Sequence, residues 1–148
     1  MKARHFAIYE LVDPITHTIY GDRAWMFFQD DTIQMLDDLW DFVKDWLGKS
    51  PTIWINDWEW GGQYQWSGLR TIYCKEGADR SMHRLGEAFD CKVDGLKDYE
   101  ALRKEIIFNQ NHPLLRRIMR IEADTATWLH IDRGNVPNRI GIVYPKGE

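Results

Sequence analysis

The segment Ser81-Met82-His83-Arg84-Leu85-Gly86-Glu87-Ala88-Phe89-Asp90-Cys91-Lys92-Val93 predicts a strand with two different faces in its second half. Successive side chains of a strand point to opposite sides of the sheet. From residue 87 onward one face would carry Phe89, Cys91 and Val93, and the other would carry Ala88, Asp90 and Lys92. This alternation predicts a sheet that packs against helices on one side and presents a polar site on the other.

A predicted antiparallel hairpin follows, with residues 117–122 and 128–132 as its strands and residues 123–127 as its turn. In the simplest symmetric register Glu122 lies opposite His130, and Asp124 lies opposite Trp128. Alternation then places four side chains on one face, namely Glu122, Trp128, His130 and Asp132. Asp124 joins this face only if the strand stays extended into the turn.

Three residues on these segments form a candidate metal site: His83, Asp90 and His130. Two imidazoles and one carboxylate bind a divalent ion and leave a fourth position open for water, as in catalytic zinc sites. Gly86 lets the backbone turn between the first two ligands, and the small Ala88 leaves room for the ion. The ligand type favours zinc, at one ion per chain. Taken alone, the spacing of His83 and Asp90 also fits an ordinary surface histidine and a capping aspartate.

Hydrolysis at such a site needs a base that accepts a proton from water and a cation that stabilises negative charge on the substrate. Glu122 is the first candidate for the base because the hairpin register brings it beside the third ligand. Asp124 is the second candidate and Asp132 the third. Arg70 is the candidate cation, because a guanidinium binds a carboxylate in a bidentate manner.

The whole chain of 148 residues predicts one α+β domain. The other expected elements are short edge strands or irregular structure at 6–12 and 15–20, a helix at 32–47, a strand at 52–57, a long loop at 58–68 and a helix at 96–108. Asp31 or Thr32 is the expected N-cap of the first helix, and Gly48 its C-terminal stop. The expected architecture is a small antiparallel sheet with helices packed on one face and a metal cleft on the other.

Aromatic residues are concentrated in the predicted loop at 58–68, which carries Trp58, Trp60, Tyr64 and Trp66. Long loops in compact domains are often functional, so these rings are candidates for the wall of the cleft. The ordinary alternative is that they pack the loop onto the core, and we favour packing.

Composition excludes some classes of protein. The net charge is −4 and no long basic run occurs, which argues against nucleic-acid binding as the main function. No apolar run reaches transmembrane length, so membrane insertion is not expected. No signal peptide is evident, so we expect synthesis in the cytoplasm. Cys74 and Cys91 form no metal-binding or disulfide pattern, and either two buried thiols or one disulfide is possible.

The motifs together resemble those of the M15 zinc peptidases. Ser81 to Asp90 is similar to SxHxxGxAxD, Trp128 to Asp132 is similar to WxHxD, and Ser67 to Arg70 is similar to the SGYR-type element that precedes them. The family includes D-Ala-D-Ala carboxypeptidases and L-alanyl-D-glutamate endopeptidases, among them phage endolysins, and shares its fold with the Hedgehog signalling domain. The resemblance covers residues 53–132 and lies in co-linear motifs.

This resemblance implies zinc bound by His83, Asp90 and His130, and cleavage of peptidoglycan stem peptides. It implies that Arg70 and Ser81 hold the substrate and that an acid near the third ligand is the base. A phage or prophage origin would follow by analogy, with action on the cell wall after release or from a phage particle.

The sequence departs from the family pattern at the base. Several members carry the catalytic acid three residues before the last histidine, where this chain has Thr127, so Glu122 and Asp124 both stay open. A binding or structural module that is stabilised by a metal without turnover is the alternative function. A small α+β protein with no metal is a third possibility. Carboxypeptidase and endopeptidase action, and the oligomeric state, also stay open.

Overall fold

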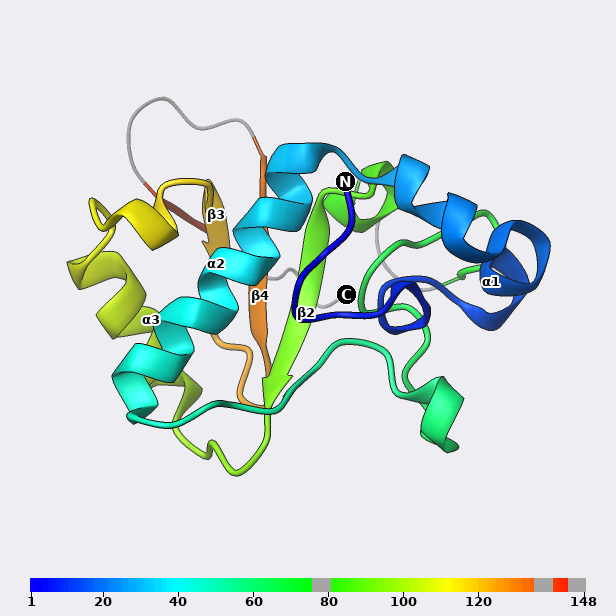
Figure 1. The fold of residues 1–148 in the computed structure, drawn as a ribbon. Coiled ribbons are helices and arrows are strands. Elements are labelled where there is room, and N and C mark those ends of the chain that lie inside the picture. The colour runs from blue at the N-terminus through cyan, green and yellow to red at the C-terminus, as the bar shows by residue number, and fades with distance from the viewer. Residues whose placement is uncertain (76–80, 135–139, 144–148) are drawn as a thin grey trace.

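Strand β2 (Ala88–Val93) is an inner strand of a five-stranded sheet, in the part of the chain that the computed structural model describes: residues 1–75, 81–134 and 140–143 (Figure 1). The strand order is β1-β2-β4-β3-β5. The other strands are β1 (Ile53–Trp54), β3 (Arg120–Glu122), β4 (Leu129–Asp132) and β5 (Gly141–Val143). With three helices, these strands make a single small α+β domain, as the sequence predicts.

The predicted hairpin register is confirmed. Strands β3 and β4 are antiparallel and pair Arg120 with Asp132 and Ile121 with Ile131, so the next position brings Glu122 opposite His130. The other edge of β4 pairs with β2, and this pairing sets Asp90 directly opposite His130.

The prediction of a purely antiparallel sheet is wrong, because β5 pairs with β3 in parallel. Both edges of β4 are already paired, with β2 on one side and β3 on the other. A later strand can therefore join only at an outer edge of the sheet, and β5 joins at the edge of β3. Since β5 runs opposite to β4, it runs in the same direction as β3, and the sheet is mixed.

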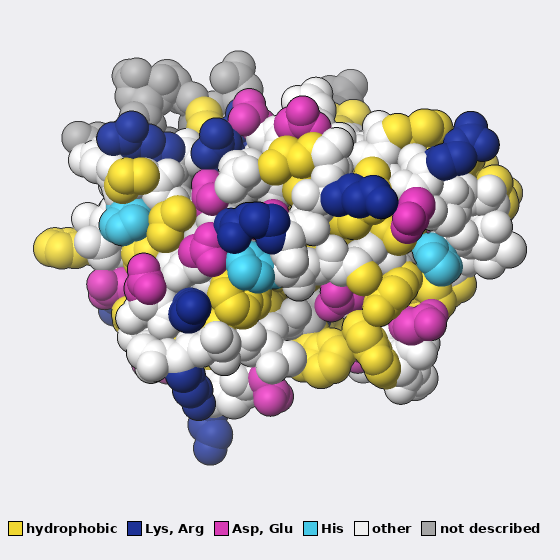
Figure 2. Space-filling model, viewed as in Figure 1, with side chains coloured by type: hydrophobic (Ala, Val, Ile, Leu, Met, Phe, Trp, Pro, Cys, Tyr) yellow, Lys and Arg dark blue, Asp and Glu magenta, His cyan; other side chains and the backbone are white. Residues whose placement is uncertain are grey.

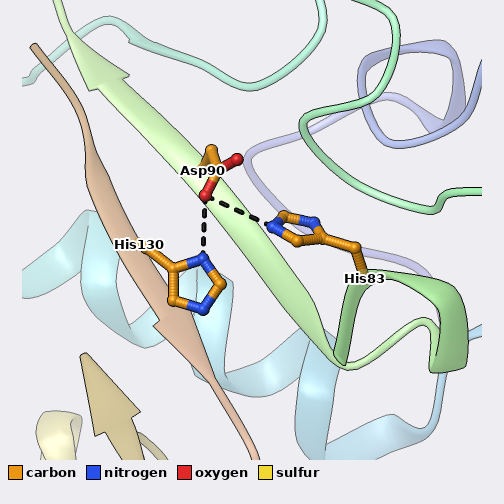
Figure 3. A group of neighbouring side chains, drawn as sticks. All are labelled: His83, Asp90 and His130. Carbon is orange, nitrogen blue, oxygen red and sulfur yellow. Dashed lines mark hydrogen bonds and ion pairs between the residues drawn. The ribbon is translucent and has the colours of Figure 1, made fainter. Parts of the chain in front are cut away.

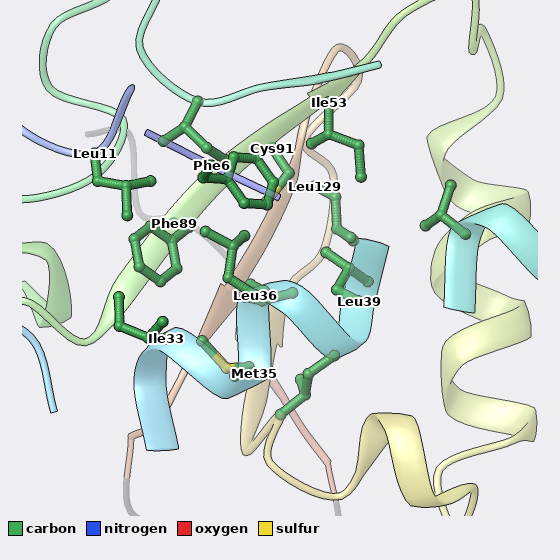
Figure 4. Close-up of a cluster of buried hydrophobic side chains, with 14 of the residues drawn as sticks. Phe6, Leu11, Ile33, Met35, Leu36, Leu39, Ile53, Phe89, Cys91 and Leu129 are labelled. Carbon is green, nitrogen blue, oxygen red and sulfur yellow. The ribbon is translucent and has the colours of Figure 1, made fainter. Parts of the chain in front are cut away.

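Helix α2 (Asp30–Leu47) covers one face of the sheet (Figure 1). It begins two residues before the predicted start, with Gln29 as N-cap in place of Asp31 or Thr32, and it ends as predicted at Gly48, whose φ is 72°. Its buried stripe faces the apolar side chains of β2 and β4, as the cluster in Figure 4 shows for Leu36 and Phe89.

Two other helices complete the domain. Helix α1 (Pro14–Tyr20) replaces the edge strand or irregular structure expected at 15–20, because Asp13 caps it by accepting from the Thr16 amide and Pro14 occupies its first position. Helix α3 (Tyr99–Phe108) begins three residues later than predicted, at the point where the Asp98 carboxylate accepts from the Ala101 amide.

The strand predicted at 52–57 is shortened to β1 by Asn56. The Asn56 amide donates to the Glu10 carbonyl, and its side chain donates to the Val12 carbonyl and accepts from the Ser67 amide. These bonds tie the segment to the N-terminal region instead of the sheet. The following residues form the predicted loop, which contains the short 3-10 helix η3 (Trp58–Trp60). The segment at 6–12, expected as a short edge strand or irregular structure, contains another, η1 (Ile8–Glu10).

The surface over α2 carries charges of both signs, interspersed with neutral groups (Figure 2). Among the described residues no helix is both long enough and apolar enough to cross a membrane. Cys74 and Cys91 are buried thiols and are not joined by a disulfide.

Candidate metal centre

The face of the sheet opposite α2 holds the three predicted ligands (Figure 3). Strands β2 and β4 supply Asp90 and His130, which are direct cross-strand partners. His83 reaches the same point from the 3-10 helix η4 (Met82–Leu85), which precedes β2. Because neighbouring strands lie only about 5 Å apart, strand pairing alone brings the side chains of a cross-strand pair close together.

The turn that carries His83 explains the residues around it. The Ser81 hydroxyl caps η4 by accepting from the His83 amide at 3.2 Å. Gly86 ends η4 with a φ of 67°, and a Cβ on this residue would clash with the carbonyl oxygen of Phe27. Glycine is therefore required here for two reasons, its left-handed backbone and its lack of a side chain.

The three side chains converge on one point. One ligand atom from each lies within 4.8 Å of the others. Oδ1 of Asp90 is 2.9 Å from Nδ1 of His130 and 3.3 Å from Nε2 of His83. Both imidazoles are almost completely buried, with 2% of His83 and 4% of His130 exposed. The group is therefore a largely buried cluster of two imidazoles and one carboxylate rather than a set of surface residues.

The outer nitrogen of each imidazole is held by an acceptor. Nδ1 of His83 donates to the carbonyl oxygen of Gly68 at 2.8 Å, so Nε2 faces Asp90. Nε2 of His130 donates to Oδ2 of Asp132 at 2.7 Å, so Nδ1 faces Asp90. Metal-binding histidines use the same arrangement, in which a carbonyl or carboxylate fixes the ring and raises its basicity. The donor set and its orientation therefore fit a divalent ion such as zinc.

Asp132 is itself fixed in place. It accepts from Nε of Arg120 at 2.8 Å, from a terminal nitrogen of Arg120 at 3.2 Å and from the Gly134 amide at 2.8 Å. A carboxylate held by a bidentate guanidinium is rigid, so it orients the His130 ring precisely. These contacts give Asp132 an orienting role, although the sequence suggested it as a third candidate for the base.

The charges of the cluster support one another. Burial alone would lower the pKa of His130, but hydrogen bonds to Asp132 and Asp90 outweigh it and raise the pKa to about 10. Burial alone would raise the pKa of the Asp90 carboxyl, but His83 and His130 hold it well below its usual range. Asp90 is thus an anion at neutral pH, and without a metal the protonated His130 balances its charge, so a divalent ion would have to displace that proton to bind.

Glu122 lies beside the cluster and Asp124 does not. Oε1 of Glu122 is 3.4 Å from Nδ1 of His130, and a quarter of its side chain (25%) is exposed. Burial raises the pKa of Glu122, which moves this carboxyl toward the range of a general base. Strand β3 ends at Glu122, and Asp124 is exposed in a turn with a φ of 63°. The strand is therefore not extended as far as Asp124.

The two predicted substrate residues have different positions. The Arg70 guanidinium lies at the cluster, 3.3 Å from Oδ2 of Asp90, and its Nε donates to the Trp66 carbonyl. The Ser81 hydroxyl serves the turn before His83, as described above, and no contact with Asp90 or His130 is found among the described residues.

Sequence reasoning missed two groups at the centre. The Gly68 carbonyl orients His83, but a backbone carbonyl has no signature in a sequence. Lys92 lies beside Asp90, with its Nζ 2.8 Å from the Ser67 hydroxyl and 3.4 Å from the Asp90 carbonyl oxygen. Alternation placed Lys92 on the same strand face as Asp90, but no role at the site was predicted for it.

Comparison of the chain with protein-family models, with curated proteins and with solved structures found no match.

Proposed function

We propose that this protein is a zinc-dependent peptidase that hydrolyses peptide bonds in peptidoglycan stem peptides. The observation that carries the proposal is the convergence of His83, Asp90 and His130, with an acceptor on the outer nitrogen of each imidazole. A site with three protein ligands leaves room for water, whereas a structural zinc site is usually closed by four. The resemblance of the surrounding motifs to M15 peptidases supports the same class.

Bound zinc would polarise the scissile carbonyl and lower the pKa of water. Residues of the chain would accept the proton that the water loses and stabilise the negative charge that develops on the substrate. Glu122, at the edge of the cluster and partly open to solvent, is assigned as the base that accepts the proton. Asp124 is not assigned this role, because β3 ends at Glu122 and Asp124 is exposed in the turn that follows.

Arg70 is assigned to the substrate. Its guanidinium lies 3.3 Å from Asp90 and keeps further donors that a substrate carboxylate or a developing oxyanion can accept from. Ser81 is assigned no contact with the substrate. Its hydroxyl accepts from the His83 amide and stabilises the turn that carries this ligand.

The substrate class rests on the resemblance alone. The protein would reach the stem peptides of the cell wall after its release from the cytoplasm, or while it is part of a phage particle. The alternative on the same fold is a module in which the metal stabilises the structure without turnover.

The decisive experiment has two stages. Elemental mass spectrometry of protein purified without chelator should find about one zinc per chain, and a His83→Ala variant should lose it. Purified muropeptides are then incubated with wild type and with Glu122→Gln, and the products are identified by mass spectrometry.

The expected result is cleavage by wild type and a loss of about 10²–10⁴-fold in Glu122→Gln with zinc retained. Zinc without cleavage would favour the metal-stabilised module. Absence of metal, even after zinc is supplied, would overturn the proposal.

A further inference from the structure

An aromatic pocket of about 240 Å³ adjoins the metal centre along strand β2. It is lined by Trp54, Asp57, Trp60, Gly62, Tyr64 and Lys92. Lys92 connects the two regions, because it lies two residues after Asp90 on the same face of β2 and its Nζ is 3.4 Å from the Asp90 carbonyl oxygen. A substrate at the metal centre therefore has this pocket as its neighbour.

The aromatic walls of the pocket are exposed but held in place. Trp60 is 54% exposed and Tyr64 is 42% exposed, which is unusual for such large rings. Trp60 makes edge contacts with Trp54, at 5.2 Å between ring centres, and with Tyr9, at 5.6 Å. Trp58 behaves differently, since its indole nitrogen donates to the Val12 carbonyl and anchors the loop to the core. In this loop Trp58 therefore packs against the core, whereas Trp60 and Tyr64 line the open pocket.

The backbone around the pocket is also fixed. The Tyr64 amide donates to the Asp57 carboxylate, and the amides of Trp60 and Gly62 donate to the Asp57 carbonyl. A Cβ on Gly62 would clash with the Asp57 side chain, so the loop closes tightly over this residue. A wall that is rigid before binding loses little conformational entropy when a ligand arrives.

The charged groups that line the pocket are one cation and one anion. Lys92 Nζ lies 4.3 Å from the centre of the Tyr64 ring and donates to the Ser67 hydroxyl. Asp57 supplies the carboxylate. A ligand with a net charge would be attracted by one group and repelled by the other. A neutral ligand with both donors and acceptors can use both groups, and flat apolar faces would complement the rings.

We infer that this pocket binds a single sugar ring. A pyranose has apolar C–H faces that stack on aromatic rings, and its hydroxyl groups donate to a carboxylate and accept from an ammonium group. The inference rests on the proposed function in one respect: the ring would belong to the glycan strand, an N-acetylated amino sugar attached to the stem peptide that is cut. The pocket would then position the wall polymer while the peptide lies at the metal centre.

The test uses a saccharide without any peptide, so that binding is measured apart from hydrolysis. The trimer of N-acetylglucosamine is titrated into chelator-treated protein, and the tryptophan indole N–H signals are followed by two-dimensional NMR. We expect saturable shifts in wild type, with affinity about tenfold weaker in Trp60→Ala and in Tyr64→Ala, because each loses one stacking face. Phe108→Ala is the matched control, since Phe108 is 87% exposed at the end of α3.

The outcomes separate this inference from the proposed function. Saccharide binding without muropeptide cleavage would support the pocket and contradict the peptidase. Cleavage without saccharide binding at millimolar concentration, or equal binding by wild type and both folded aromatic variants, would overturn the pocket. A second readout is the ratio of KM for glycan-linked and free stem peptides, which should lose its preference for the linked form in Trp60→Ala.

Discussion

The two faces of strands β2 and β4 are both buried, but different interactions bury them. On the α2 side Phe89, Cys91 and Leu129 are completely buried by packing. On the other side His130 and Asp132 are nearly as buried, and hydrogen bonds and ion pairs satisfy them. Packing tolerates exchange between side chains of similar volume, whereas a buried polar network is damaged when any one partner is lost. The same strands therefore serve stability on one face and specific chemistry on the other.

The largest expected effect comes from the apolar face. Phe89→Ala should reduce the free energy of unfolding by about 3–5 kcal/mol, because it leaves a cavity beneath α2 where no solvent reaches. Denaturant unfolding measures this loss. The exposed residue Phe108 provides the control, and Phe108→Ala should change stability by less than about 0.5 kcal/mol. A similar small effect of Phe89→Ala would contradict the packing described for this face.

The turn before β2 should be the next most sensitive point. Gly86→Ala places a Cβ against the Phe27 carbonyl at a left-handed φ of 67°, whereas Gly95→Ala meets no atom within 4 Å at a φ of 80°. Gly95→Ala should therefore cost only the backbone strain, about 1–2 kcal/mol, and Gly86→Ala should cost more. Thermal unfolding of the two variants compares these costs directly. If both variants lost the same stability, the close approach of the Phe27 carbonyl would make no contribution to the requirement for glycine at position 86.

The polar face should respond through metal affinity rather than stability alone. Asp132→Asn keeps the shape of the side chain but removes the carboxylate that orients His130, so zinc should bind about 10–100-fold more weakly. Competition with a chromophoric chelator measures this change. An unchanged affinity would mean that Asp132 is not needed to orient the ring.

The smallest effect is expected at Asp124, the second candidate for the base. Asp124→Asn removes its charge, and asparagine tolerates the left-handed φ of 63°, so neither stability nor muropeptide cleavage should change. Parallel rate measurements on Glu122→Gln give the contrast. Loss of cleavage in Asp124→Asn with normal rates in Glu122→Gln would reverse the assignment of the base.

Particular residues show how far the sequence predicted this fold. Three features were predicted correctly because each depends on residues close together in the chain. They are the alternation around Asp90, the helical stripe that ends at Gly48, and the position of Glu122 opposite His130. Some predictions failed because a local cap was overlooked, as at Asp13 before α1 and Asp98 before α3, and one failed because a distant segment intervened. Asn56 bonds to residues near position 12 and shortens β1.

The candidate site shows the same division. Asp90 and His130 followed from residue type and strand face, and His83 followed from the motif before the strand. The structure brings one ligand atom of each within 4.8 Å of the others. The acceptors that orient them were not predictable, because Gly68 uses a backbone carbonyl and Asp132 was considered only as a base. Lys92 and the loop at 58–68 form the aromatic pocket only when the chain is folded.

The sequence by itself determined the local elements, the two-faced strands and the identity of the chemical groups, because periodicity and side-chain type are properties of neighbouring residues. Tertiary structure alone decided the parallel pairing of β5, the exposed turn position of Asp124 and the partners that hold each imidazole. These features depend on which edges remain unpaired and which backbone groups approach from far along the chain, and such long-range contacts are selected by the whole packed domain.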